Sequence, residues 1–85
     1  MQTPYEIGDS LWLVYPWEDK PIEAKVSMMT VKVDKTWKVR VSYSGKYGKD
    51  CYEVKADAIN TFKCGLFEKY EDAEIALIKS KEYAW

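Results

Sequence analysis

Histidine is missing from this 85-residue chain, and with it the most common general base of enzymes near neutral pH. The sequence also lacks a serine or cysteine in a recognisable nucleophile motif, and a glycine-rich loop that opens a helix. Its carboxylates are scattered rather than paired. These absences predict a protein that is not an enzyme and that uses no cofactor.

Cysteine is scarce, because only Cys51 and Cys64 are present, thirteen positions apart and without a CxxC motif. Two thiols without any histidine supply too few ligands for a structural zinc site, so we predict no metal. We expect two reduced, largely buried thiols in a cytoplasmic protein, with a disulfide or a redox role as the alternative.

Long hydrophobic runs are absent as well. No apolar stretch approaches the roughly 20 residues that a membrane-spanning helix needs. The N-terminal residues show no basic segment followed by an apolar one, so no signal peptide is predicted. We therefore expect one cytoplasmic domain over residues 1–85 with no membrane partner.

Neither sign of charge is in excess, since the formal net charge is −1, but the charges are unevenly distributed. Residues 1–19 carry four acidic side chains and no basic one, whereas residues 20–49 carry eight cations against Glu23 and Asp34. Residues 50–85 are net acidic again. A basic middle between acidic ends keeps nucleic-acid binding open without arguing for it.

Aromatic residues are abundant, with four Trp and seven Tyr, and they mark the clearest strand. From 37 to 44, Trp37, Val39, Val41 and Tyr43 alternate with polar or charged residues. A period of two over eight residues predicts an antiparallel strand with one dry face and one wet, partly cationic face.

An earlier strand is predicted over residues 10–15, and both of its faces are apolar. Leu11, Leu13 and Tyr15 share one face, and Trp12 and Val14 share the other. Because a strand with two apolar faces needs cover on both, we expect another element, such as the C-terminal helix, to pack on the second face.

The strand predicted between these two, residues 22–34, changes the phase of its apolar alternation at Met28 and Met29. A β-bulge at that point would keep both halves facing the core, so that Met28, Val31 and Val33 all point inward. Such a bulge would also bend the strand sharply, as small barrels require.

The remaining residues predict shorter elements and one helix. We expect a strand at 51–54, a single turn over 55–59 with Ile59 inward, and a last strand over 61–67 kinked at its glycine. From Tyr70 to about Lys81 the spacing predicts a helix. Its inward arc holds Tyr70, Ala73, Ala76, Leu77 and Ser80. Ile75 lies opposite this arc, as a tolerated surface residue or as part of a contact.

Two short motifs resemble those of a known group of proteins. Ile7-Gly8-Asp9-Ser10-Leu11-Trp12 resembles the start of small SH3-like barrels of the Tudor type. Leu66 to Glu74 resembles the "phenylalanine, short spacer, acidic-acidic-alanine-glutamate" ending of small barrel proteins of bacterial phages, prophages and mobile elements, although Lys69 replaces the hydroxyl cap common there. The resemblance implies a mainly β fold, a five-stranded SH3-like barrel with a C-terminal helix, and it implies no activity.

Four aromatic residues are candidates for contact with a protein or peptide, namely Tyr15, Trp17, Tyr43 and Tyr47. Trp17 stands in a loop bracketed by Pro16 and Pro21, where it either folds back as a lid or is offered to a partner. In SH3-like barrels such loops gather aromatic residues around a ligand. An aromatic cage for a cation, or a groove for a proline-rich segment, is chemically possible here.

Six cations of the hairpin 20–49 are candidates for contact with nucleic acid, namely Lys25, Lys32, Lys38, Arg40, Lys46 and Lys49. Tyr43 and Tyr47 lie among them and offer rings on which a base can stack. The alternative is a solvated face that keeps a β-rich protein soluble and protects its edges.

The sequence as a whole predicts a small non-catalytic binding module that acts by protein–protein contact, as a monomer or as a homodimer paired through a sheet edge. Its size and the resemblance suggest an accessory protein of a phage or mobile element that occupies a surface of a bacterial host protein. Inhibition of a host defence nuclease, as by an anti-CRISPR protein, is one version. The alternative function is nucleic-acid binding through the basic hairpin.

Overall fold

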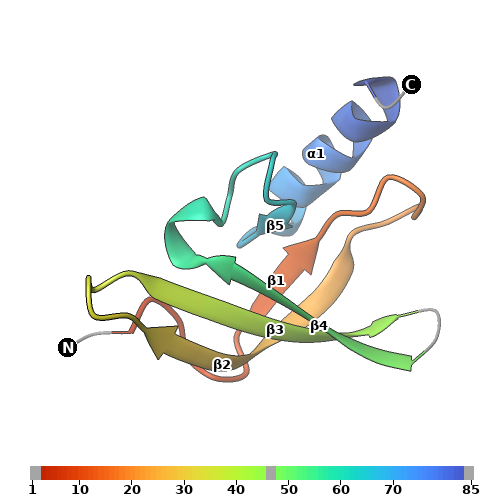
Figure 1. The fold of residues 1–85 in the computed structure, drawn as a ribbon. Helices are drawn as coiled ribbons and strands as arrows, with labels where there is room; N and C mark the ends of the chain where they lie inside the picture. The colour runs from red at the N-terminus through yellow and green to blue at the C-terminus, as the bar shows by residue number, and fades with distance from the viewer. Residues whose placement is uncertain (1–2, 46–47, 84–85) are drawn as a thin grey trace.

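Five antiparallel strands curl into a half-barrel followed by an α-helix in the computed structural model, which describes residues 3–45 and 48–83 (Figure 1). The strands are β1 (Ser10–Leu13), β2 (Ile22–Val31), β3 (Trp37–Gly45), β4 (Gly48–Lys55) and β5 (Leu66–Phe67). A 3-10 turn, η1 (Ala56–Ala58), follows β4, and the helix is α1 (Tyr70–Tyr83). The sheet order is β4-β3-β2-β1-β5, so the predicted mainly β fold class is confirmed.

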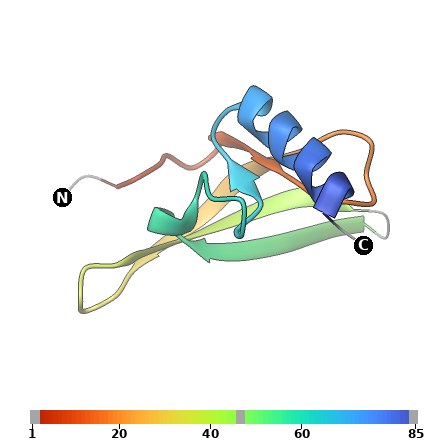
Figure 2. The same ribbon diagram turned by 90° about the horizontal axis from the view of Figure 1, so that it is seen from above.

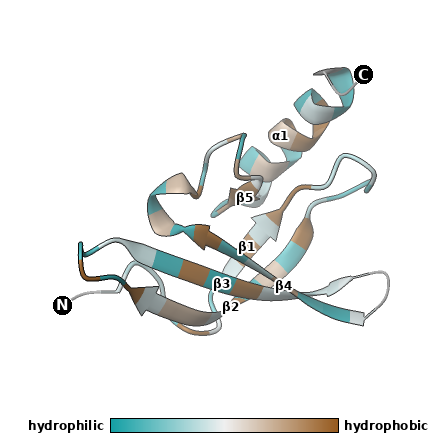
Figure 3. Ribbon diagram, viewed as in Figure 1, coloured by the Kyte–Doolittle hydropathy of each residue, from teal (hydrophilic) through white to brown (hydrophobic). Residues whose placement is uncertain are grey.

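The centre of the sheet is β3, and its alternation agrees with the prediction. Val39 and Val41 are fully buried and Tyr43 is 8% exposed, all on the concave inner face. Val41 stands opposite Val26 of β2 and Tyr52 of β4, so the apolar residues of three strands meet in one layer. Figure 3 shows apolar and polar residues alternating along β3. Burial of this layer removes apolar surface from water and holds the curled sheet together.

The bulge in β2 lies at Ser27, just before the position predicted for it. Val26 is opposite Val41 and Met28 is opposite Arg40, so Ser27 is the extra residue. Arg40 points to the convex outer face, and Met28 therefore does the same and is 42% exposed. The prediction that Met28 faces the core is wrong, because the bulge comes before it and shifts its side to the outer face.

The distal end of the β2–β3 hairpin extends beyond the core. β1 pairs only with residues 22–25 of β2, so no strand of the described chain covers the residues after the bulge. Val31 is 44% exposed and Val33, in the turn beyond the strand, is 104% exposed. Val31 stands opposite Trp37, on the same side of the sheet as Val39, so its direction agrees with the prediction. The prediction that Val31 and Val33 face a core is wrong, because a correct alternation buries a side chain only where another element packs over it.

The helix α1 covers the second face of β1, as predicted. Phe67, Ala73 and Ala76 form a small buried cluster, and Trp12 and Val14 pack against it. The Trp12 and Tyr70 rings meet edge to face with centroids 5.0 Å apart. Figure 2 shows α1 lying over the β1–β5 side of the sheet. One face of β1 thus packs in the half-barrel core and the other face packs against this helix cluster.

The C-terminal segments differ from the prediction in three places. β4 begins at Gly48 and is longer than the predicted 51–54 strand, and β5 is reduced to Leu66–Phe67 because residues 61–65 form a turn. Gly65 has a φ of 76°, a left-handed value that favours glycine. Ile59 is buried, as predicted. Cys51 is exposed on the outer face of β4, so the prediction of two largely buried thiols is wrong for it.

Candidate functional site

A tight turn after β1 brings Trp17 to the surface. The Glu18 amide donates to the Tyr15 carbonyl at 3.0 Å, which closes a turn with Pro16 and Trp17 at its two central positions. Proline favours the first of these positions because its ring presets φ. The sequence therefore places the indole at the tip of the turn, where it is 72% exposed.

Tyr15, Trp17 and Tyr43 form a connected group that we call the aromatic platform. The Tyr15 and Trp17 rings are stacked, with centroids 4.6 Å apart and an interplanar angle of 12°. Tyr15 also meets Tyr43 edge to face, with centroids 6.1 Å apart, and their hydroxyl groups are 2.5 Å apart in a hydrogen bond. The exposed indole thus stacks on a ring that is hydrogen-bonded to the buried Tyr43.

The sequence singled out these three residues separately, and the fold brings them together. Tyr15 shares the inward side of Leu11 and Leu13 and packs against the core, whereas Tyr43 reaches the same place from β3. Tyr47, the fourth predicted contact residue, lies outside the described residues, as does Lys46.

The pKa of Tyr43 is raised above its ordinary value of 10.0, first by the hydrogen bond with Tyr15 and then by burial. The folded chain therefore keeps this proton at pH values at which the unfolded chain loses it. The resulting stabilisation is fully present below about pH 10 and is lost as the pH rises further, by up to about 1.4 kcal/mol per pH unit for one group.

We expect the unfolding free energy of the Tyr43→Phe variant to fall less steeply above pH 10 than that of the wild type. Urea titrations at pH 8 and at several values above pH 10 measure the two slopes. At pH 8 the variant should be about 1 kcal/mol less stable, because the Tyr15 hydroxyl loses its partner. Equal alkaline slopes would show that Tyr43 does not contribute.

Four of the six predicted nucleic-acid contacts share one surface, which we call the basic outer face: Lys25, Lys38, Arg40 and Lys49. The register places them on the outer side of the sheet, because their opposite residues, such as Ser42 and Ser44, also lie there. A shallow depression of about 250 Å³ lies on this face and is lined by Glu23, Lys25, Ser42, Tyr43, Ser44 and Lys49. Lys32 does not belong to this face, because it lies in the hairpin turn after β2.

Carboxylates interrupt the positive charge of the basic outer face. Glu53 lies 3.5 Å from Arg40 and 4.0 Å from Lys38, both measured from guanidinium or ammonium nitrogen to carboxylate oxygen. Glu23 borders the depression beside Lys25 and accepts a hydrogen bond from Ser10. The face therefore presents alternating charge, with Lys25 and Lys49 as the cations that border the depression.

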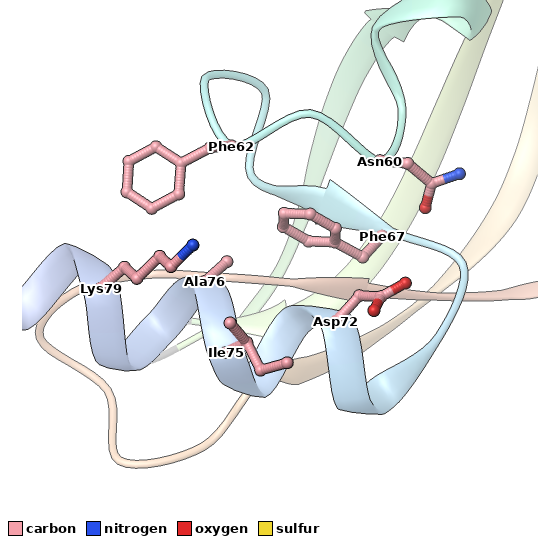
Figure 4. Close-up of a pocket in the computed structure, with 7 residues that line it drawn as sticks. All are labelled: Asn60, Phe62, Phe67, Asp72, Ile75, Ala76 and Lys79. Atoms are coloured by element: carbon pink, nitrogen blue, oxygen red, sulfur yellow. The ribbon is translucent and has the colours of Figure 1, made fainter.

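A groove between α1 and the turn before β5 was not predicted from the sequence. It has a volume of about 270 Å³ and is lined by Asn60, Phe62, Phe67, Asp72, Ile75, Ala76 and Lys79 (Figure 4). Phe62 and Ile75 are 53% and 52% exposed. The one sequence signal for this groove is the position of Ile75 opposite the inward arc of the helix, which is compatible with either a surface residue or a contact.

Comparisons with models of protein families, with curated proteins and with solved structures found no match for this chain. Within residues 3–45 and 48–83, no three acidic or cysteine side chains gather in a way that could hold a metal ion. In the same part of the chain, no helix has the length and apolar character needed to span a bilayer.

Proposed function

We propose that the protein is a small binding module without catalytic activity that acts by contact with another protein through the aromatic platform. The observation that carries this proposal is the state of Trp17, which is 72% exposed and yet stacked on a tyrosine that is bonded to the core. A large aromatic ring held in one orientation gives contact area at little cost in conformational entropy. Such rings are frequent among the residues that dominate binding energy at protein interfaces.

The charges beside Trp17 support a partner that presents a cation, and the indole surface also suits a proline-rich segment. Glu18 and Asp19 follow the indole in the same loop, and the Asp19 side chain is fully exposed, although one of its oxygens lies 4.0 Å from Lys81. An Arg or Lys side chain placed on the indole would be attracted by the ring and by these carboxylates. A proline ring would stack on the same surface.

The proposed setting rests on the small size of the chain and on the resemblance to barrel proteins of phages and mobile elements. We propose a cytoplasmic accessory protein of SH3-like type that occupies a surface of a bacterial host protein in a fixed ratio. An inhibitor of a host defence nuclease, comparable to an anti-CRISPR protein, is the most specific form of this proposal.

The Trp17→Ala variant tests the platform. We expect it to bind the partner recovered from bacterial lysate at least about 30-fold more weakly than the wild type, which corresponds to a hot-spot loss of about 2 kcal/mol. Its circular dichroism spectrum should match that of the wild type, because the indole is mostly outside the core. The measurement is a titration of the recovered protein with each variant.

Phe62→Ala is the matched control, since Phe62 is also an exposed aromatic residue but lies in the groove beside α1. It should bind like the wild type. If Phe62→Ala loses binding and Trp17→Ala retains it, the contact surface is the groove and the platform is excluded.

Nucleic-acid binding is the second candidate, favoured by the gathering of Lys25, Lys38, Arg40 and Lys49 on the basic outer face. The Glu53 ion pairs and the net charge of −1 act against it. A fluorescent single-stranded oligonucleotide titrated at several salt concentrations decides the question. Contacts between these cations and phosphates would make affinity fall steeply with salt. Absence of binding at low salt would exclude this function.

A further inference from the structure

The strand β4 is an edge of the sheet, and no strand of the described residues pairs with it on the side away from β3 (Figure 1). It has eight residues, contains no proline and pairs with β3 without a register shift. Six of these residues are exposed, namely Gly48, Lys49, Asp50, Cys51, Glu53 and Lys55. A long, regular edge of this kind presents a row of backbone groups that another strand can join.

One hydrogen bond shows which backbone groups point outward. The Cys51 amide donates to the Asp50 side chain at 2.8 Å, so this N–H is directed away from the ladder with β3. Backbone groups alternate in direction along an antiparallel strand. The amide and carbonyl groups of Lys49 and Glu53 therefore also face the free edge.

The charges of β4 favour an antiparallel pair of two copies that is centred on Cys51. If Cys51 of one copy stands opposite Cys51 of the other, Lys49 of each copy stands opposite Glu53 of its partner copy. Opposite charges directly across an antiparallel pair are stabilising, whereas like charges are destabilising.

Each neighbouring register opposes like charges instead. Centring the pair on Lys49, Asp50 or Glu53 places that residue opposite itself, and centring it on Tyr52 places Lys49 opposite Lys55. Centring the pair on Val54 places Glu53 opposite Lys55, which also joins opposite charges, but it leaves only two facing pairs of outward-directed residues within β4. The register centred on Cys51 has three such pairs, the largest number among the registers that satisfy both charge and backbone direction.

We propose that two copies of this chain associate through β4, antiparallel and centred on Cys51, to form one continuous sheet. About six main-chain hydrogen bonds join the copies, two for each of the three facing pairs. On association the Cys51 amide exchanges its bond to Asp50 for a bond to the carbonyl of the other copy. Two Lys49–Glu53 pairs fix the register on the outer face.

A charge-swap series tests the register. By analytical ultracentrifugation, Lys49→Glu and Glu53→Lys should each weaken self-association about tenfold, because both attractive pairs become repulsive. The double variant carrying both substitutions should recover it, since each pair again joins opposite charges. Lys63→Glu, which makes the same charge change in an exposed turn, should self-associate like the wild type. A wild type that is monomeric at every concentration, or a double variant that is not restored, would overturn the proposal.

The native Cys51 thiol provides a second test, because residues facing each other in such a pair have Cα atoms about 5.5 Å apart, within the range of a disulfide. In a Cys64→Ser background, diamide should link the two Cys51 sulfurs, taking two electrons and two protons and becoming the hydrazine. Lys49→Glu should suppress this link and the double swap should restore it. Linking that is indifferent to Lys49→Glu would reflect random collision and would contradict the register.

Discussion

Replacement of Leu13 by alanine is expected to lower the unfolding free energy by about 3 kcal/mol. Leu13 is 2% exposed and stands opposite Ile22 of β2 and Leu66 of β5, so it packs where three strands meet. Its truncation removes apolar contacts and leaves a cavity that the surrounding strands cannot close. A domain of this size has little stability to spare, so most of its margin would be lost.

Urea denaturation followed by circular dichroism measures this change, and Val33→Ala is the control. Val33 is 104% exposed, and its truncation should change the unfolding free energy by less than about 0.5 kcal/mol. The pair also tests the distal hairpin, because the alternation in the sequence predicted Val33 to face the core. A Val33→Ala effect as large as that of Leu13→Ala would show that the distal hairpin is covered in solution.

Phe67→Ala is expected to release the helix from the sheet, with a loss of about 3 kcal/mol or more. Phe67 is 5% exposed and forms the buried cluster with Ala73 and Ala76 of α1. The two alanines cannot fill the space that the ring leaves. Because α1 packs on β1 and β5, its loss exposes Trp12 and leaves the inner-face core in place.

Hydrogen exchange distinguishes this outcome from global destabilisation. In Phe67→Ala, the amides of α1 should exchange at a lower opening free energy than those of β2 and β3, because the helix can separate without unfolding the sheet. Phe62→Ala, a change of the same residue type at a position 53% exposed, should leave helix protection near that of the wild type. An equal loss of protection in helix and sheet would mean that the two clusters unfold as one unit.

The local elements of the fold followed from the sequence where a strict period ran along a segment. The alternation of β3 identified its buried side, and the two apolar faces of β1 identified the need for a second covering layer. The helix packs there through Ala73 and Ala76. In each case backbone geometry sets the period with which side chains change direction. The order of apolar and polar residues is therefore sufficient to identify the buried side.

The site was predictable only in its parts. The turn that exposes Trp17 follows from Pro16, whereas the bond between Tyr15 and Tyr43 joins residues 28 positions apart and depends on the curl of the sheet. The groove beside α1 could not be predicted, because it arises between the helix and a turn whose relative position only the packing of Phe67 sets.

Residue order along single segments is enough to predict the mainly β character, the presence of a bulge in β2 and the face of β1 that the helix covers. Only the packed fold shows that the bulge lies at Ser27 and turns Met28 to the outer face, that Val31 is exposed, and that Cys51 lies on an edge strand of the sheet. Side-chain direction is a local property of the backbone. Burial depends on other elements packing over a side chain, and because β1 pairs only with residues 22–25 of β2, the curled part of the sheet does not extend to Val31.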